Sequence, residues 1–120
     1  MDQSFRKEER LKSARDIDAL FEAGSGAKVY PLAIRYRQSD SLACHQVAFS
    51  VPKRRIKLAV KRNLIKRRMR EAYRLNKPAL PPGGTGCWQM MLIYLAPEEL
   101  DYEQIERAWR KICLRLNNAG

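Results

Sequence analysis

The sequence predicts an α+β fold in which a mixed sheet of about four strands and three helices form a two-layer sandwich. The chain has 120 residues, 45% of them hydrophobic, which is enough for one modest core and too few for two. Segments with a hydrophobic period of two alternate with segments whose period is 3.6. Their order is α-β-β-(β)-α-β-α, in which the bracketed strand is not assigned to particular residues. We therefore expect a single domain over residues 1–120.

The first helix is expected over Ala14–Ala23. Ser13 precedes it and Asp16 follows three residues later, which is the spacing of a capping box, and Gly24 is a typical helix stop. The hydrophobic positions lie at helical spacing: Ile17, Leu20 and Phe21. The basic residues 1–12 before this helix are expected to form a mobile terminus.

Two strands are expected next, over residues 32–37 and 47–51. In each of them hydrophobic residues alternate with smaller or polar ones, as in a strand with one buried face. The polar residues 38–42 connect them. We expect the two strands to be antiparallel neighbours, although the sequence is also compatible with another pairing.

The second half of the chain predicts a helix, a strand and a helix. The helix runs from Leu58 to Leu75 and ends at Asn76, before the Pro- and Gly-rich loop 78–86. Residues 88–95 are nearly all hydrophobic, which favours a central strand with two buried faces. Asp101 is positioned to cap the final helix.

The positive charge is concentrated in one segment. The formal net charge is +11, and residues 53–74 hold eleven of the 24 Lys and Arg residues but only one acidic residue, Glu71. On the predicted helix, one stripe is hydrophobic: Leu58, Ile65, Met69 and Ala72. The opposite stripe is cationic: Asn63, Lys66, Arg67, Arg70 and Arg74. We therefore expect one face to pack on the sheet and the other to bind a polyanion.

The alternative interpretation of such a run is a solvated helix face. Solvated faces usually mix Glu with Lys, and this sequence has that mixture in residues 98–115 but not in the basic helix. Neighbouring cations at i and i+4 slightly destabilise a free helix. Arg also outnumbers Lys in the helix, which favours phosphate recognition. The pattern therefore favours a nucleic-acid ligand.

A motif within this helix resembles a known signature. Residues 57–71 read Lys-Leu-Ala-Val-Lys-Arg-Asn-Leu-Ile-Lys-Arg-Arg-Met-Arg-Glu, which closely resembles the signature of the bacterial ribonuclease P protein subunit. The resemblance extends to Arg10-Leu11, Phe21 and the segment 50–53, so it covers nearly the whole chain. It departs from the family at Lys57, near which a small residue is usual, and at Leu64, where a basic residue is usual.

The resemblance implies a function. The family is the protein partner of a catalytic RNA, and the complex hydrolyses precursor tRNA to remove its 5′ leader. The implied partners are that RNA and precursor tRNA, with no membrane and no required protein partner. Five residues are implied to contact the RNA subunit: Arg62, Asn63, Lys66, Arg67 and Arg70.

The resemblance also implies a cleft for the single-stranded leader, between the first helix and one face of the sheet. Its implied residues are Phe21, Ala33, Arg35, Ala48, Ser50, Lys66 and Arg70. The small side chains on that face fit a shallow groove, and Arg35 and Arg37 add charge to it. Phe21 either stacks on an unpaired base or packs in the core. Tyr36, Tyr73 and Trp88 are expected to pack, with Ile65, Met69 and Trp109 in the core.

No catalytic residue and no metal ligand is predicted in the protein itself. The resemblance assigns catalysis to the RNA and to Mg²⁺ held mainly by that RNA. Cys44, Cys87 and Cys113 match neither a disulfide framework nor a CxxC zinc site, so we expect reduced thiols. His45 beside Cys44 is expected to be structural. Asp18 and Glu22 are expected to be a surface pair.

The sequence predicts a cytoplasmic protein, because it contains no signal-peptide pattern and its longest hydrophobic run is far shorter than a membrane helix. Two other functions remain compatible with the basic helix. A structural RNA-binding protein, such as a ribosomal protein, would share the same two-layer fold. A DNA-compacting protein is less compatible, because the charge lies in one stripe and no minor-groove arm is evident.

Overall fold

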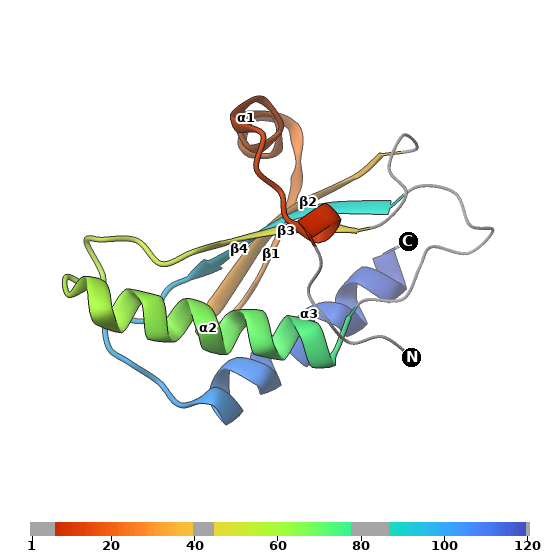
Figure 1. Cartoon of the computed structure of the whole chain (residues 1–120). Coiled ribbons are helices and arrows are strands. Elements are labelled where there is room, and N and C mark those ends of the chain that lie inside the picture. The colour runs from red at the N-terminus through yellow and green to blue at the C-terminus, as the bar shows by residue number, and fades with distance from the viewer. Residues whose placement is uncertain (1–6, 40–44, 78–86, 120) are drawn as a thin grey trace.

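The computed structural model describes residues 7–39, 45–77 and 87–119. It has the expected α+β architecture, with three α-helices and a four-stranded mixed sheet (Figure 1). The elements in chain order are the 3-10 helix η1 (Lys7–Glu9), α1 (Ala14–Ala23), β1 (Ser25–Val29), β2 (Leu32–Ser39), β3 (Gln46–Ser50), α2 (Ala59–Leu75), β4 (Cys87–Tyr94) and α3 (Tyr102–Ala119). The Pro- and Gly-rich loop and Cys44 lie outside the described residues.

The order of strands in the sheet is β1-β2-β4-β3. The expected antiparallel pairing of β2 with β3 is therefore wrong, because β4 lies between them. β2 pairs with β4 in antiparallel register from Leu32 opposite Tyr94 to Ser39 opposite Cys87, and β3 pairs with β4 in parallel. Seven of the eight residues of β4 are buried, which explains its central position: a strand that is hydrophobic on both faces loses most water contact there.

The strand that the sequence did not place is β1. It follows α1 directly and pairs antiparallel with β2 at the edge of the sheet. Gly24 makes the tight turn into β1 possible, because a Cβ atom there would lie 2.5 Å from the Leu20 carbonyl oxygen. The segment Ser-Gly-Ala-Lys-Val has a single β-branched residue, Val29, and no aromatic residue, so pairing with β2 determines its conformation.

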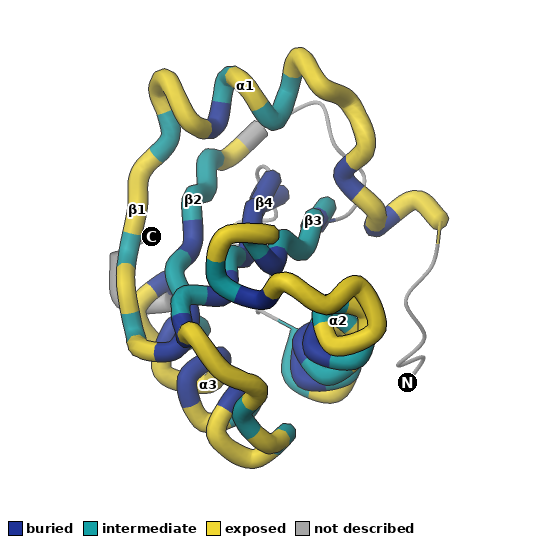
Figure 2. The backbone as a smooth tube through the Cα atoms, turned by 90° about the vertical axis from the view of Figure 1, so that its left-hand side faces the viewer, coloured by how far each residue is buried: buried dark blue, intermediate teal, exposed yellow. Residues whose placement is uncertain are grey.

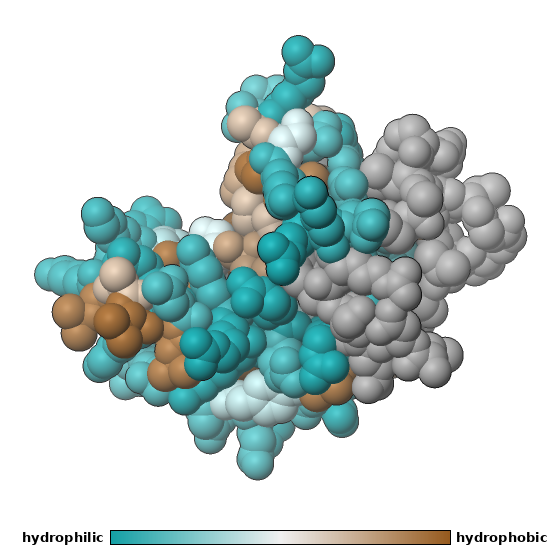
Figure 3. Space-filling model, viewed as in Figure 1, coloured by the Kyte–Doolittle hydropathy of each residue, from teal (hydrophilic) through white to brown (hydrophobic). Residues whose placement is uncertain are grey.

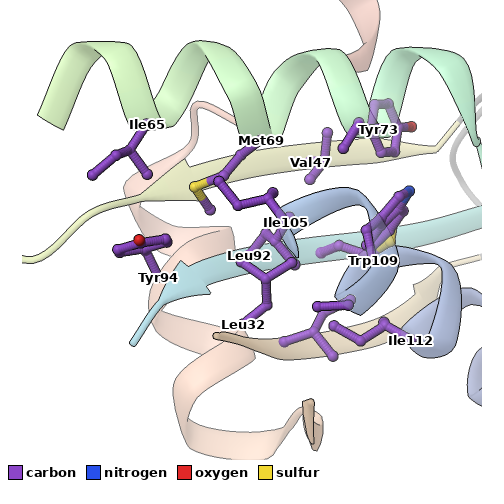
Figure 4. Close-up of a cluster of buried hydrophobic side chains, with 14 of the residues drawn as sticks. Leu32, Val47, Ile65, Met69, Tyr73, Leu92, Tyr94, Ile105, Trp109 and Ile112 are labelled. Carbon is purple, nitrogen blue, oxygen red and sulfur yellow. The ribbon is translucent and has the colours of Figure 1, made fainter. Parts of the chain in front are cut away.

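The main core lies between one face of the sheet and the pair α2 and α3. Ile65, Met69 and Trp109 are fully buried there, as expected, together with Tyr73 (Figure 4). The Trp109 indole Nε1–H donates a 2.8 Å hydrogen bond to the Asn76 carbonyl oxygen at the end of α2. Two long helices are thereby fixed on one face of the sheet, and their outer surfaces remain exposed (Figure 2).

The opposite face of the sheet carries α1. Its amino-terminal end has the expected cap, since the Asp16 backbone N–H donates to the Ser13 hydroxyl oxygen. Leu20 packs in a second, smaller cluster with Leu11 and Met91. The first helix therefore stands over the sheet on the side away from α2 and α3 (Figures 1 and 2).

Residues 7–11, which were expected to be mobile, contact the β3 edge. Leu11 is buried, and its backbone N–H donates a 3.0 Å hydrogen bond to the Val47 carbonyl oxygen. Glu9 is also buried and forms a 2.6 Å ion pair with Lys77. The start of the described chain is thus attached to both β3 and the end of α2.

Asp101 caps the final helix as expected, by accepting a hydrogen bond from the Gln104 backbone N–H. Among the described residues, no helix is long and hydrophobic enough to cross a membrane.

Candidate nucleic-acid interface

The helix α2 has the two faces that its sequence predicts. Ile65, Met69 and Ala72 are fully buried against the sheet and α3. Leu58, expected in the same hydrophobic stripe, is 62% exposed. It is the N-cap residue, with extended backbone angles, so the helical periodicity that would place its side chain in the stripe does not apply to it.

Three arginines of α2 are bound within the protein. Arg62 Nη1 donates to the carbonyl oxygens of Ile56 and Lys57, which fixes the path into the helix. Arg68 Nη1 donates 2.8 Å to the Leu100 carbonyl oxygen and lies 3.0 Å from a Glu99 carboxylate oxygen.

The third is Arg74, which pairs with Glu71 through both Nε and Nη2. The hydrogen bond from Arg74 lowers the pKa of the Glu71 carboxyl below its ordinary value. The single acidic residue of α2 therefore neutralises one arginine at the end of the helix and leaves the cations before it unopposed.

The remaining cations form the outer surface of α2. Within the described part of the chain, no carboxylate is within ion-pair distance of these side chains, and Figure 3 shows hydrophilic atoms along this surface. The set is Lys61, Lys66, Arg67 and Arg70, and Asn63 is exposed beside them. We call these five residues the α2 stripe. It contains four of the five residues predicted to contact an RNA subunit, and the fifth, Arg62, has one nitrogen bound to backbone.

A groove of about 500 Å³ lies on the other face of the sheet, next to the end of α1. Its lining combines small residues, two cations and one aromatic ring: Phe21, Gly26, Ala27, Lys28, Ala33, Ile34, Arg35 and Ile93. Phe21 is 50% exposed, so of the two alternatives for this ring the structure excludes a core position. We call this hollow the α1 groove.

Arg35 joins the α1 groove to the helix. Its Nε and Nη2 donate to the carbonyl oxygens of Leu20 and Phe21, at 3.3 and 2.9 Å. A cation at a helix carboxyl end can hydrogen-bond to the last carbonyl groups and interacts favourably with the helix dipole. Arg35 therefore holds Phe21 in place at the rim and leaves a positive charge in the groove.

Arg37, the other arginine expected in the groove, is bound in a polar network. Its Nε donates 2.7 Å to the Gln89 side-chain oxygen and its Nη2 lies 3.3 Å from an Asp16 carboxylate oxygen. Gln89 in turn donates to Asp16 and to Gln46. This network joins three strands to α1, so its role is to position the helix over the sheet.

The structure brings only part of the predicted leader-binding set together. Phe21, Ala33 and Arg35 line the α1 groove. Ala48 and Ser50 lie on the same face of the sheet but two strands away, because Met91 and Ile93 of β4 stand between. Ala48 packs in the cluster beneath α1.

The other two members of that set, Lys66 and Arg70, belong to α2, which covers the opposite face of the sheet (Figure 2). They lie in the α2 stripe, outside the α1 groove.

Sequence reasoning missed the contribution of β1 to the groove. Gly26 and Lys28 line it, and a Cβ atom at position 26 would lie 3.2 Å from Arg35 Nη1. The available signal was the basic side chain of Lys28 two residues after Gly26, but only the pairing of β1 with β2 places both next to Phe21.

His45 and Cys113 lie outside these two surfaces. His45 is buried, and its Nδ1 accepts a 2.9 Å hydrogen bond from the Trp88 backbone N–H. Burial raises the pKa of the Cys113 thiol to about 12, so it stays protonated at neutral pH. Among the described residues, no three His, Cys, Asp or Glu side chains are grouped so that they could hold a metal ion.

Comparison with known proteins identifies the family. The sequence model of the family Ribonuclease P matches residues 5–117. The chain belongs to the ribonuclease P protein family. This assignment decides between the functions that the basic helix left open, in favour of ribonuclease P over a ribosomal or DNA-compacting protein.

Individual relatives agree with this assignment. The ribonuclease P protein component of Porphyromonas gingivalis is 38% identical over 122 residues, covering 92% of this chain and 84% of that protein. The ribonuclease P protein component of Edwardsiella ictaluri is 31% identical over 114 residues, covering 92% of both chains.

Solved structures share the fold. The Staphylococcus aureus RNase P protein superposes with a TM-score of 0.74 at 20% identity, covering 90% of this chain and 94% of the other. The Thermotoga maritima RNase P protein gives a TM-score of 0.72 at 22% identity, covering 89% and 96%. The ribonuclease P protein fold is thus retained in this chain despite low identity.

Proposed function

We propose that this chain is the protein subunit of ribonuclease P, which binds the catalytic RNA through the α2 stripe and the 5′ leader of precursor tRNA through the α1 groove. The observation that carries the proposal is the unopposed stripe of four cations on α2 in a chain of this family. The activity is the endonucleolytic removal of the leader, and the precursor and the RNA subunit are the partners.

The α2 stripe supports the first contact by its charge and its rigidity. The helix is held on the sheet by buried residues such as Met69, so the cations on its outer face keep fixed spacings. Lys66 and Arg70 are one turn apart, as are Asn63 and Arg67. Such a surface matches crowded phosphates of a folded RNA, and its gain comes from release of their counterions.

The α1 groove supports the second contact by its shape. Small side chains make its floor shallow, Phe21 offers an exposed ring, and Lys28 and Arg35 offer charge. An exposed aromatic ring beside cations is suited to single-stranded RNA, whose bases are free to stack. Phe21→Ala should therefore weaken leader binding at least fivefold, while its half-exposed position predicts little change in stability.

We assign the hydrolysis to the RNA subunit and its Mg²⁺. The α2 stripe holds no carboxylate that would bind a divalent cation, because Glu71 is paired with Arg74. The protein contributes position and charge: it neutralises phosphates where RNA subunit and substrate approach one another, which lowers the Mg²⁺ concentration the complex requires. Catalysis by the RNA and the cytoplasmic location are parts of this proposal.

The test is reconstitution with the RNA subunit from the same genome. Wild-type protein should stimulate 5′ cleavage of precursor tRNA at low Mg²⁺ and should not cleave in the absence of the RNA. Cleavage by RNA-free protein would overturn the assignment of the chemistry, and failure to stimulate would overturn the proposed function.

The contact surface is tested by the double variant Lys66→Ala/Arg70→Ala. Removal of two phosphate contacts should lower the slope of log affinity for the RNA subunit against log salt by roughly 1.4 to 1.8. The matched control is Lys12→Ala/Arg110→Ala, which removes one lysine and one arginine outside the stripe. Equal slopes for the two variants would contradict the α2 contact.

A further inference from the structure

A second cationic surface lies on α3, and neither the basic motif nor the two surfaces above account for it. Arg107, Lys111 and Arg115 recur at every fourth residue, so they lie along one flank of the helix. All three are exposed. Glu103 lies one turn before Arg107, yet no ion pair joins them, and within the described ranges none of the three cations has a carboxylate partner.

This flank faces away from α2. The opposite flank of α3 holds Tyr102 and Glu106, and Glu106 accepts hydrogen bonds from Tyr102 and from Asn76 at the end of α2. Arg110 pairs with Glu106 at 3.5 Å. Glu106 therefore contributes to the contact between α2 and α3. Arg107, Lys111 and Arg115 lie on the other flank, where no carboxylate of the described residues pairs with them. The body of α3 separates them from the α2 stripe.

A pocket of about 210 Å³ lies beside this flank, where the turn between β1 and β2 meets α3. Its lining includes two cations and no acidic residue: Val29, Tyr30, Pro31, Leu100, Gln104, Arg107, Ala108 and Lys111. Tyr30 is 63% exposed, so much of its side chain is accessible to a ligand. Arg115 extends the surface, since its Nη1 donates 3.0 Å to the Lys28 carbonyl oxygen on β1.

We propose that this surface is a further RNA-binding site, at which Arg107 and Lys111 bind successive phosphates and Tyr30 stacks on an unpaired base. The two cations are about 6 Å apart along the helix axis, a spacing close to that of neighbouring phosphates in an extended strand. A free aromatic ring beside unpaired cations is the combination that binds single-stranded nucleic acid without sequence preference.

The RNA that fits this site by position is the 5′ leader, which rests on the proposed function of the α1 groove. It lies across the edge strand β1 from the α1 groove, and Lys28 belongs to both, with its side chain in the groove and its carbonyl oxygen bound to Arg115. A leader that leaves the groove over this edge would reach Tyr30.

The test compares Arg107→Gln/Lys111→Gln with the control Lys12→Gln/Arg110→Gln, which has the same change of charge. The probe is a fluorescently labelled oligouridylate, and its affinity is measured by anisotropy over a series of salt concentrations. Loss of two contacts to a single strand should lower the salt slope by about 1.4 and the affinity roughly tenfold near physiological salt. Tyr30→Leu should lower the affinity at least about fivefold without changing the slope.

Two further binding measurements on the same variants test which RNA occupies the site. A fall in affinity for precursor tRNA with a long leader, but not with a short one, supports the leader as the ligand. A fall in affinity for the RNA subunit alone contradicts the leader and assigns the surface to that RNA. If the Arg107→Gln/Lys111→Gln variant binds oligouridylate with the same affinity and the same salt slope as the control variant, the proposal is overturned. That result points instead to an acidic protein ligand for this surface. The oligouridylate measurement requires no RNA subunit, so a negative result there does not contradict the proposed contact between the α2 stripe and the RNA subunit.

Discussion

Arg67 and Arg68 are neighbours on α2 with the same charge, and the structure assigns them opposite roles. Arg68 turns toward the segment before α3, where Nη1 binds the Leu100 carbonyl oxygen and Glu99. Arg67 is exposed and is part of the α2 stripe. We expect Arg68→Ala to lower stability and leave RNA binding nearly unchanged, and Arg67→Ala to do the reverse.

The size of the stability effect follows from the two contacts of Arg68. A hydrogen bond from a charged donor to a partly buried carbonyl contributes about 2 kcal/mol, because its loss leaves that carbonyl without a partner. The ion pair with Glu99 has side chains 25% and 32% exposed, so solvent screening limits it to about 0.5 kcal/mol. For a chain of this length the sum lowers the Tm by roughly 10 °C. Arg67→Ala should change the free energy of unfolding by less than about 0.5 kcal/mol.

The assays are thermal unfolding followed by circular dichroism, and the salt dependence of binding to the RNA subunit. Arg67→Ala should lower the slope of log affinity against log salt by roughly 0.8. Arg67→Lys is the control that keeps the charge, and it should keep the slope. The reasoning is refuted if Arg68→Ala retains the wild-type Tm and lowers the salt slope as much as Arg67→Ala does.

Three further predictions concern the core and its titratable groups. Met69→Ala should lower the free energy of unfolding in urea by about 3 kcal/mol, because the side chain is fully buried; a loss under about 1 kcal/mol would contradict its place in the core. Hydrogen bonds from Tyr102 and Asn76 lower the pKa of Glu106 in the folded state, so its contribution to stability is present above the ordinary value of 4.5 and is lost as pH falls through the lower folded value. The Tm difference between wild type and Glu106→Gln should therefore shrink on acidification, and a constant difference would argue against the carboxylate. Cys113, with a pKa of about 12, should be alkylated roughly a thousandfold more slowly in the folded protein than in urea, measured by peptide mass spectrometry; equal rates would contradict its burial.

Local patterns in the sequence were enough to locate most elements. The capping residues Ser13 and Asp101 and the stop at Gly24 marked helix ends correctly, because these signals act within one turn of the chain. The hydrophobic stripe of α2 was predicted for the same reason, except at Leu58, where helical geometry has not begun. β1 escaped notice because its five residues have weak strand propensity and depend on β2 for their conformation.

The candidate sites were predictable to a smaller extent. Arg67 and Arg70 could be identified as surface cations from the period of the helix. The contacts of Arg62 and Arg74 are local, with the backbone just before the helix and with Glu71 one turn earlier. The contact of Arg68 could not be deduced, because its acceptors, Glu99 and the Leu100 carbonyl oxygen, depend on how the chain folds back against α2.

The sequence by itself determined the fold class, the segregation of charge onto α2 and the family, because each of these is written in short-range periodicity or in a contiguous motif. The tertiary structure decided which strands are neighbours and therefore which side chains share a surface. It placed β4 between β2 and β3, separated Ala48 and Ser50 from the groove that contains Phe21, and put Lys66 and Arg70 on the opposite face of the sheet. It also brought Tyr30 to Arg107 and Lys111, which are more than seventy residues away in sequence. The physical reason is that the order of strands depends on how much hydrophobic surface the whole sheet buries. β4 is hydrophobic on both faces and buries the most surface at the centre, and a local sequence pattern does not show how the strands differ in this respect.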